Sequence, residues 1–290
     1  MLKLILKAMR PRQWTKNAFI FAALVFDRKL LNLEAFLDTL EAFLLFCFLA
    51  SSVYIINDIL DRESDRNHPV KKNRPIASGK LPISTALVTA IVLLLISLVG
   101  AFFLSKVFLV ICVGYFLLNL LYTKWLKHMA IIDVLVIAGC FVLRVAAGVS
   151  VIEVQRFSPW LYVVTTLLAL YLGFGKRRAE LSVLVNDNPQ SHRKVLSGYS
   201  IALVDQYITV VSASTIIAYS LYTFSGANLP DNHAMMLTIP FVLYGILRYL
   251  YLIQMRKEGG EPEEILLKDR PIQVAVLLWA ITVMVVFYLY

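Results

Sequence analysis

Four acidic or amide side chains recur at helical spacing where an apolar segment meets a strongly basic loop. They are Asn57, Asp58, Asp61 and Asp65, and Glu63 lies among them. If a helix continues through this run at about 100° per residue, the four side chains lie within roughly 100° of one another and Glu63 points away. Three carboxylates on one face repel one another unless a cation lies among their oxygens, and Mg²⁺ commonly uses one or two carboxylates together with substrate phosphate oxygens. The run therefore predicts a site for magnesium and a diphosphate, with the three aspartates as catalytic metal ligands.

The elements that must position this site are membrane-spanning helices. Of the 290 residues, 59% are hydrophobic and 16% are charged, and the mean hydropathy is +0.74, which excludes an ordinary soluble protein. Most of the apolar segments are near the 20 residues that span a bilayer as a helix. They lie at about residues 17–33, 36–57, 82–104, 106–122, 129–149, 158–175, 201–224, 234–255 and 271–290. We therefore predict an all-α, polytopic membrane bundle of nine transmembrane helices, in which the first is the weakest because Asp27, Arg28 and Lys29 interrupt it.

The basic residues predict the orientation of the bundle. Of the 28 Lys and Arg residues, 22 fall in the N-terminal arm and in the loops after the second, fourth, sixth and eighth spans. The positive-inside rule then places the N-terminus and the acidic run in the cytoplasm. Residues 1–14 begin with an amphipathic pattern that predicts an interfacial helix. The net charge of +9 is explained by this asymmetry and by attraction to membrane lipid and phosphorylated ligands, so we expect no nucleic-acid partner.

The positions of the cysteines and the lack of a linker predict a single domain without disulfides. Cys47, Cys112 and Cys140 all lie inside apolar segments and lack paired spacing, so disulfide and zinc sites are not expected. No linker separates the spans, and a single transmembrane domain over residues 1–290 is the simplest organisation. The long cytoplasmic loops at 58–81 and 176–200 are the places where we expect function.

The basic loop after the acidic run carries a resemblance to a known family. From His68 to Pro75 the chain has the form H-P-x-K-x-x-R-P. Together with the acidic run, this loop resembles the first signature of the UbiA-type polyprenyl transferases, an N-D-x-x-D-x-x-x-D helix end followed by R-P. Residues 10–17 and the G-K-R-R-A-E-L segment at 175–181 are similar to the decaprenyl-phosphate phosphoribosyltransferases within that superfamily.

The resemblance implies a fold and a set of site residues. It implies a UbiA-like bundle of nine helices in the bacterial inner membrane, with a central cavity capped on the cytoplasmic side. Mg²⁺ and a diphosphate would be held there by Asn57 and the three aspartates, with Lys71 and Arg74 as phosphate-binding cations. His68 is expected to make loop hydrogen bonds and not to bind metal.

One motif departs from the wider family. Other UbiA-type enzymes carry a second Asp-rich motif after the sixth span, and this chain has Lys176, Arg177, Arg178 and Glu180 there. On a helix, Lys176, Arg177 and Glu180 fall within about 100°. Fixed cations can hold phosphate oxygens without a metal, so this cluster predicts a binding site for a lipid monophosphate. The alternative is that these cations only anchor the sixth span.

Further candidate substrate-binding residues carry weaker signals. Lys16 and Asn17, together with Arg10, lie at the entrance of the first span, and Tyr122 and Lys124 end the fourth; interfacial anchoring is the alternative for each. Arg144 lies inside the fifth span and must find a partner or a wet cavity. Asp133, eleven residues earlier on the same helix, is about 16 Å away and is not expected to pair with it.

These features predict an enzyme. As the resemblance implies, it would transfer a 5-phosphoribosyl group from phosphoribosyl diphosphate to a long-chain polyprenyl (decaprenyl) monophosphate, with Mg²⁺ and release of diphosphate. The first alternative is a prenyl transferase that moves a polyprenyl group from its diphosphate to an aromatic or glyceryl acceptor. A transporter is less consistent with acids that gather at helix ends, and a noncatalytic lipid-binding scaffold is the third alternative.

Overall fold

The helical fold follows the apolar segments of the sequence. A computed structural model describes residues 1–67, 70–154, 158–184, 196, 198–226, 228–255, 265 and 268–289. Every regular element in these ranges is a helix, so the predicted all-α class is confirmed for them. His68 and residues 185–195 of the predicted second loop lie outside the described residues.

The chain divides into two compact units. Unit 1 consists of Met1–Leu126 and Leu143–Val154, and unit 2 consists of Lys127–Val142 and Gln155–Tyr290. Helix α7 (Ile132–Val149) therefore contributes its first residues to unit 2 and its last residues to unit 1.

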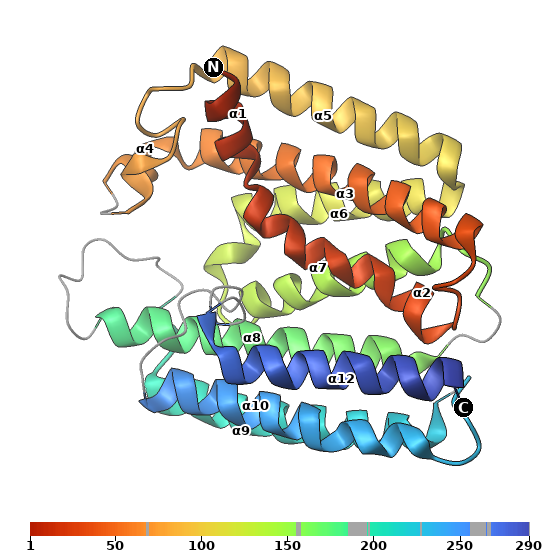
Figure 1. Ribbon diagram of the computed structural model, residues 1–290. Coiled ribbons are helices and arrows are strands. Elements are labelled where there is room, and N and C mark those ends of the chain that lie inside the picture. The colour runs from red at the N-terminus through yellow and green to blue at the C-terminus, as the bar shows by residue number, and fades with distance from the viewer. Residues whose placement is uncertain are drawn as a thin grey trace. The chain divides into compact units, whose positions relative to one another are not determined.

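Unit 1 is organised around two packed helices, α3 and α5, which lie side by side (Figure 1). Ser52 Oγ donates to the carbonyl oxygen of Ala90 at 2.9 Å, and Ser97 Oγ donates to that of Leu45 at 2.9 Å. Small residues and such interhelical hydrogen bonds let helix backbones approach closely in membranes. This packing fixes the end of α3, where the acidic run begins. The elements of this unit besides α7 are α1 (Leu2–Met9), η1 (Pro11–Phe21), α2 (Ala22–Phe26), α3 (Leu33–Leu60), α4 (Arg62–Arg66), η2 (Lys71–Asn73), α5 (Ile83–Leu104) and α6 (Lys106–Lys124).

The amphipathic N-terminal helix is shorter than residues 1–14. Helix α1 ends at Met9, and Arg10 adopts a left-handed conformation with φ 54° and ψ 61°. Pro11 follows, and its ring disfavours a helical conformation at the preceding residue. Ala8 and Met9 are buried, and α1 packs against α3. The turn at Arg10 therefore connects α1 to the start of η1.

Unit 2 packs α8 against α9 and α10 against α12. Its core contains Tyr171, Phe174, Ile208, Ile246 and Tyr249. Tyr171 donates its hydroxyl hydrogen to the carbonyl oxygen of Ile246 at 2.7 Å, which joins α8 to α10. The core thus fixes α8, whose last turns carry the predicted cations. The described helices of this unit besides α7 are α8 (Pro159–Leu184), α9 (Ile201–Ser225), η6 (Ala234–Thr238), α10 (Ile239–Met255) and α12 (Arg270–Leu289), and η3 (Leu126–His128) lies at the boundary between the units.

Seven helices among the described residues are long and apolar enough to cross a membrane. They establish an integral membrane helical bundle, whereas the predicted number of nine spans is not shown. In the predicted first span, η1 and α2 end at Phe26, directly before the charged triplet that weakened the prediction. The predicted sixth span is the 26-residue α8, which is not among the seven because its apolar stretch ends in the charged cluster. The seven are Leu33–Leu60, Ile83–Leu104, Lys106–Lys124, Ile132–Val149, Ile201–Ser225, Ala234–Met255 and Arg270–Leu289.

Candidate functional site

The acidic run extends from α3 through a turn into α4. Asp61 interrupts the helix with φ −89° and ψ 7°. Its N–H nevertheless donates to the carbonyl oxygen of Asn57 at 2.8 Å, and the N–H of Asp65 donates to that of Asp61 at 2.8 Å. Helical hydrogen bonds therefore continue across the turn, close to the helix that the sequence predicts.

Arg74 joins two of the three aspartates. Its Nη1 donates to Asp58 Oδ1 at 3.1 Å and to Asp65 Oδ2 at 2.6 Å. Both acids are buried, with exposed fractions of 2% for Asp58 and 3% for Asp65. Seven residues separate them, which brings two side chains to within about 20° on a helix. The structure therefore brings these two carboxylates and the predicted cation together.

Asp61 differs from the other two aspartates. It is half-buried and makes interactions of its own. Within the described ranges, no group of three or more His, Cys, Asp and Glu side chains is placed to hold a metal ion. Asp61 is the residue of the turn between α3 and α4, and it is less buried than Asp58 and Asp65.

Arg10 is a second cation on Asp58. Its Nη2 donates to Asp58 Oδ1, and its guanidinium lies over the ring of Tyr54, 5.2 Å from the centroid. The left-handed turn before Pro11 directs this side chain, and a residue in that conformation is often found at functional sites. The side chains of Arg10 and Arg74 are each 28% exposed. Solvent therefore reaches the cations but hardly reaches the acids.

The donor atoms of this cluster suit a hard divalent cation. Asp58 and Asp65 provide carboxylate oxygens, and both already share one positive partner. Mg²⁺ commonly takes one or two protein carboxylates and completes its shell with water and phosphate oxygens. Two converging carboxylates fit that pattern.

The neighbouring predicted residues lie on α6 and η2. Thr123, buried on α6, has one hydroxyl hydrogen with two acceptors in reach, Asn57 Oδ1 and the carbonyl oxygen of Asn119, the latter at 2.8 Å. Lys71 begins η2 and is half-buried. Near the end of α6, Tyr122 is half-buried, and Lys124 is exposed with its Nζ 4.4 Å from the centroid of the Trp125 ring. Asn57 is therefore held by a side chain, whereas Lys124 makes a cation–π contact.

Arg144 and Asn17 form one buried network in unit 1. Arg144 Nε donates to Asn17 Oδ1 at 2.8 Å, and its Nη2 donates to the hydroxyl oxygen of Tyr115 at 3.0 Å. Its guanidinium also lies over the rings of Tyr115 and Phe46. Asn17 Nδ2 donates to Cys47 Sγ at 3.2 Å. Arg144 thus finds the partner that an arginine within a span requires, and Lys16, next to Asn17, is half-buried.

Arg177 is the centre of a buried ion-pair network in unit 2. It is 1% exposed; its Nε donates to Asp133 Oδ2 at 2.6 Å, and its Nη1 donates to Glu180 Oε2. Tyr199 donates its hydroxyl hydrogen to Asp133 Oδ1 at 2.7 Å and accepts the N–H of Ile131 at 2.5 Å. Burial, reinforced by the Asp133 carboxylate, raises the pKa of Tyr199 above its usual range, so the phenol remains a donor.

The two cations beside Arg177 have different environments. Arg178 Nε donates to Asp205 Oδ1 at 2.6 Å, and its Nη1 donates to the carbonyl oxygen of Ile253 at 2.7 Å. Lys176 is half-buried and precedes the network by one residue. Arg177 and Arg178 are therefore fixed by carboxylates of their own unit.

Several of these contacts were not predicted from the sequence. Arg10 was only a weak candidate, although the Arg-Pro step after an amphipathic helix was a signal for a fixed turn. Asp133 at the start of an apolar segment signalled a need for a cation but did not identify Arg177. Thr123 and Tyr199 carry no local signal, because a single Thr or Tyr in an apolar chain is common in packing.

The comparisons with known proteins agree on one protein family. The sequence profile of the UbiA prenyltransferase family matches residues 18–264. A protein of Mycobacterium tuberculosis named decaprenyl-phosphate phosphoribosyltransferase is 33% identical over 283 residues, which cover 96% of this chain and 92% of that protein. A Corynebacterium glutamicum protein of the same name is 33% identical over 98% of this chain and 87% of its own length.

The fold is also similar to a solved structure. A UbiA homologue from Archaeoglobus fulgidus, solved with DMAPP and Mg²⁺, superposes with a TM-score of 0.71 at 19% identity and covers 99% of both chains. At this identity the likeness concerns the fold alone.

Proposed function

The chain belongs to the UbiA prenyltransferase family, and we propose that it transfers the 5-phosphoribosyl group of phosphoribosyl diphosphate to a long-chain polyprenyl monophosphate. Diphosphate is released, and the lipid class is that of decaprenyl phosphate. Two proteins named decaprenyl-phosphate phosphoribosyltransferase align with nearly the whole chain, and this similarity supports the choice of substrates.

The buried pair of Asp58 and Asp65 on Arg74 is the observation that carries the proposal. In the proposed mechanism, the carboxylates of Asp58 and Asp65 would hold Mg²⁺, and Asp61 would lie beside them. The Archaeoglobus homologue was solved with this ion. When bound, Mg²⁺ supplies positive charge that offsets the charge developing on the leaving diphosphate.

The cations around the acids bind the donor. Arg74 and Arg10 reach the carboxylates from the solvent side, so their guanidinium groups can turn to the diphosphate oxygens, which they can hold with paired, charge-assisted hydrogen bonds. Lys71 begins the short helix next to Arg74 and adds a third positive charge. Asn57, fixed by Thr123, presents its amide beside Asp58. These residues position the donor before any bond changes.

The acceptor phosphate is assigned to the charged end of α8. Lys176 is the cation for its oxygens, and Arg177, held by Asp133 and Glu180, is a positioning residue that fixes this turn. A monophosphate needs no second metal when fixed cations neutralise it. The lipid chain remains among apolar surfaces and avoids exposure to water.

The reaction is a displacement at the anomeric carbon. A phosphate oxygen of the lipid forms the new bond to this carbon, and the bond to the diphosphate breaks, with its electron pair leaving on the diphosphate. The nucleophile is already ionised at neutral pH, so no general base is required. The residues of the chain contribute positioning and charge neutralisation.

The proposal includes a topology. One UbiA-like domain extends over residues 1–290 with nine spans, an interfacial segment at 1–14 and active-site loops at 58–81 and 176–200. The N-terminus and the site face the cytoplasm of a bacterial inner membrane. Twenty-two basic residues in the N-terminal arm and in loops on one side support this orientation.

One assay compares this function with its main alternative. Purified protein receives Mg²⁺, phosphoribosyl diphosphate and polyprenyl monophosphate, and we expect diphosphate release with a phosphoribosylated lipid. A second reaction contains a prenyl diphosphate and an aromatic or glyceryl acceptor, as the fold likeness to a homologue solved with DMAPP would favour. Product only in the second reaction would replace the proposal with prenyl transfer.

A further inference from the structure

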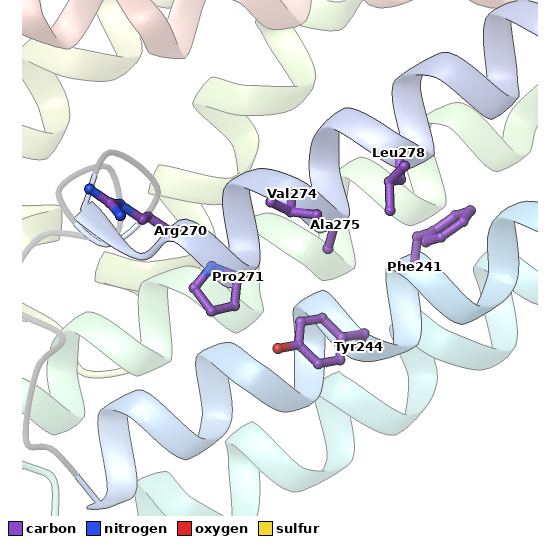
Figure 2. Close-up of a pocket in the computed structure, with 7 residues that line it drawn as sticks. All are labelled: Phe241, Tyr244, Arg270, Pro271, Val274, Ala275 and Leu278. Atoms are coloured by element: carbon purple, nitrogen blue, oxygen red, sulfur yellow. The ribbon is translucent and has the colours of Figure 1, made fainter.

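A groove lies between α10 and α12 of unit 2, and its lining residues come from these two helices. Its volume is about 480 Å³, and Figure 2 shows its lining. Phe241 and Tyr244 contribute from α10, and Val274 and Leu278 contribute from α12. Apart from one arginine and one phenol, the side chains that line it are apolar.

The walls of the groove face outward from the unit. Tyr244, Val274 and Leu278 are all exposed, and both helices are candidate membrane spans. The exposed apolar side chains of these two candidate spans suit contact with lipid hydrocarbon. Its volume lies in the range of pockets for one small ligand, roughly 300–1,000 Å³.

One end of the groove is positively charged. Arg270 lies at this end and is the first residue of α12. The preceding Asp269 does not cancel this charge, because it is bound by Arg248 Nη2 at 2.9 Å and accepts the N–H of Ile272 at 3.0 Å. Arg270 makes no ion pair with any residue in the described part of the chain. Figure 2 shows the Tyr244 hydroxyl on the side of Pro271 and Arg270, with the Arg270 guanidinium turned away from that hydroxyl.

We propose that this groove binds one acyl chain of an anionic phospholipid, whose headgroup phosphate lies at Arg270. The apolar walls match the chain, and the cation matches the phosphate. In the predicted topology, the start of α12 faces the cytoplasmic leaflet, where anionic lipids attract basic residues. The groove has room for one acyl chain, whereas the chain of a polyprenyl phosphate is much longer.

Native mass spectrometry of the full chain in detergent tests the proposal. The protein is titrated with phosphatidylglycerol, phosphatidylcholine or a polyprenyl phosphate, and the dissociation constant of the first bound lipid is measured. We expect phosphatidylglycerol to bind about fivefold more tightly than phosphatidylcholine, which is the effect of one basic residue at a membrane surface. Arg270→Gln should reduce this preference to less than about twofold, and Arg270→Lys should retain it.

Two substitutions on α12 form a matched pair that tests the apolar lining of the groove. Val274 lines the groove and is 54% exposed, whereas Val276 does not line it and is 49% exposed. Val274→Trp should weaken the binding of phosphatidylglycerol by about tenfold because the indole fills the space of the chain, and Val276→Trp should leave it unchanged. Equal binding of both phospholipids to the unmodified protein, or equal effects of the two tryptophans, would refute the site. Tighter binding of polyprenyl phosphate that only Val274→Trp abolishes would overturn the proposed occupant.

Discussion

Replacing Asp65 with Asn tests the site most directly. The substitution keeps the size of the side chain and removes one of the two buried charges on Arg74. Loss of one preorganised electrostatic group in an enclosed site typically lowers turnover by 100-fold or more, about 2.7 kcal/mol of transition-state stabilisation. We expect Asp65→Asn and Asp58→Asn each to lower kcat/KM for phosphoribosyl diphosphate by at least ~100-fold, and Asp61→Asn to do the same if it completes the ion's surroundings.

Glu63 provides the matched control within the same run. Its side chain is 79% exposed, and its contact with Arg66 Nη1 measures 3.4 Å. Exposed ion pairs of this kind contribute about 0–1 kcal/mol. Glu63→Gln removes the same charge two residues from Asp65 but points away from the cluster, so its turnover should stay within about twofold of the unmodified protein.

The assay follows diphosphate release over a range of Mg²⁺ concentrations. If Asp58 and Asp65 hold the ion, each substitution should move the half-saturating Mg²⁺ concentration upward, and Glu63→Gln should not. A single symmetric peak in size-exclusion chromatography confirms that each variant is folded. Near-normal turnover in both aspartate variants, or an equal loss in Glu63→Gln, would refute the metal assignment.

Three other substitutions test the remaining networks. Asp133→Asn removes a carboxylate from buried Arg177, so the free energy of unfolding should fall by about 3 kcal/mol; an unchanged thermal midpoint in detergent would contradict this. Arg144→Lys replaces a planar donor stacked on aromatic rings with an ammonium group, and we expect a lower thermal midpoint and at least about tenfold slower turnover. Lys176→Gln should raise KM for the polyprenyl phosphate about tenfold and leave KM for phosphoribosyl diphosphate within twofold; equal changes in both constants would argue against its assignment to the acceptor.

The predictable part of the site is the part set by local periodicity. Asp58 and Asp65 share a face because they are seven residues apart on nearly continuous helix, and the basic loop that follows them is short enough to return Arg74 to that face. Hydropathy similarly indicated most of the spans. It placed the end of the first span too late, because the helical stretch ends at Phe26, directly before the charged triplet that weakened the prediction.

The contacts between distant segments could not be predicted. Asn17 lies 127 residues before Arg144, and Asp133 lies 44 residues before Arg177. Periodicity shows which face of a helix is polar but not which other helix lies beside it. The sequence therefore identified Arg144 and Arg177 and placed Glu180 on the face of Arg177, but it left the distant partners Asn17 and Asp133 unknown.

The two arginine networks differ in a way that bears on function. Arg177 extends from the charged end of α8 and is enclosed by carboxylates of its own unit, so releasing it would leave buried charges unpaired, at a cost of several kcal/mol. Arg74 extends from a loop and Arg10 from a left-handed turn, and both are open to solvent, so each can leave its carboxylate when another cation replaces it. In the proposed mechanism, Asp58 and Asp65 would hold Mg²⁺, and Arg10 and Arg74 would bind the diphosphate. Ligand exchange is therefore expected at Asp58 and Asp65, while the Arg177 network keeps the end of α8 fixed.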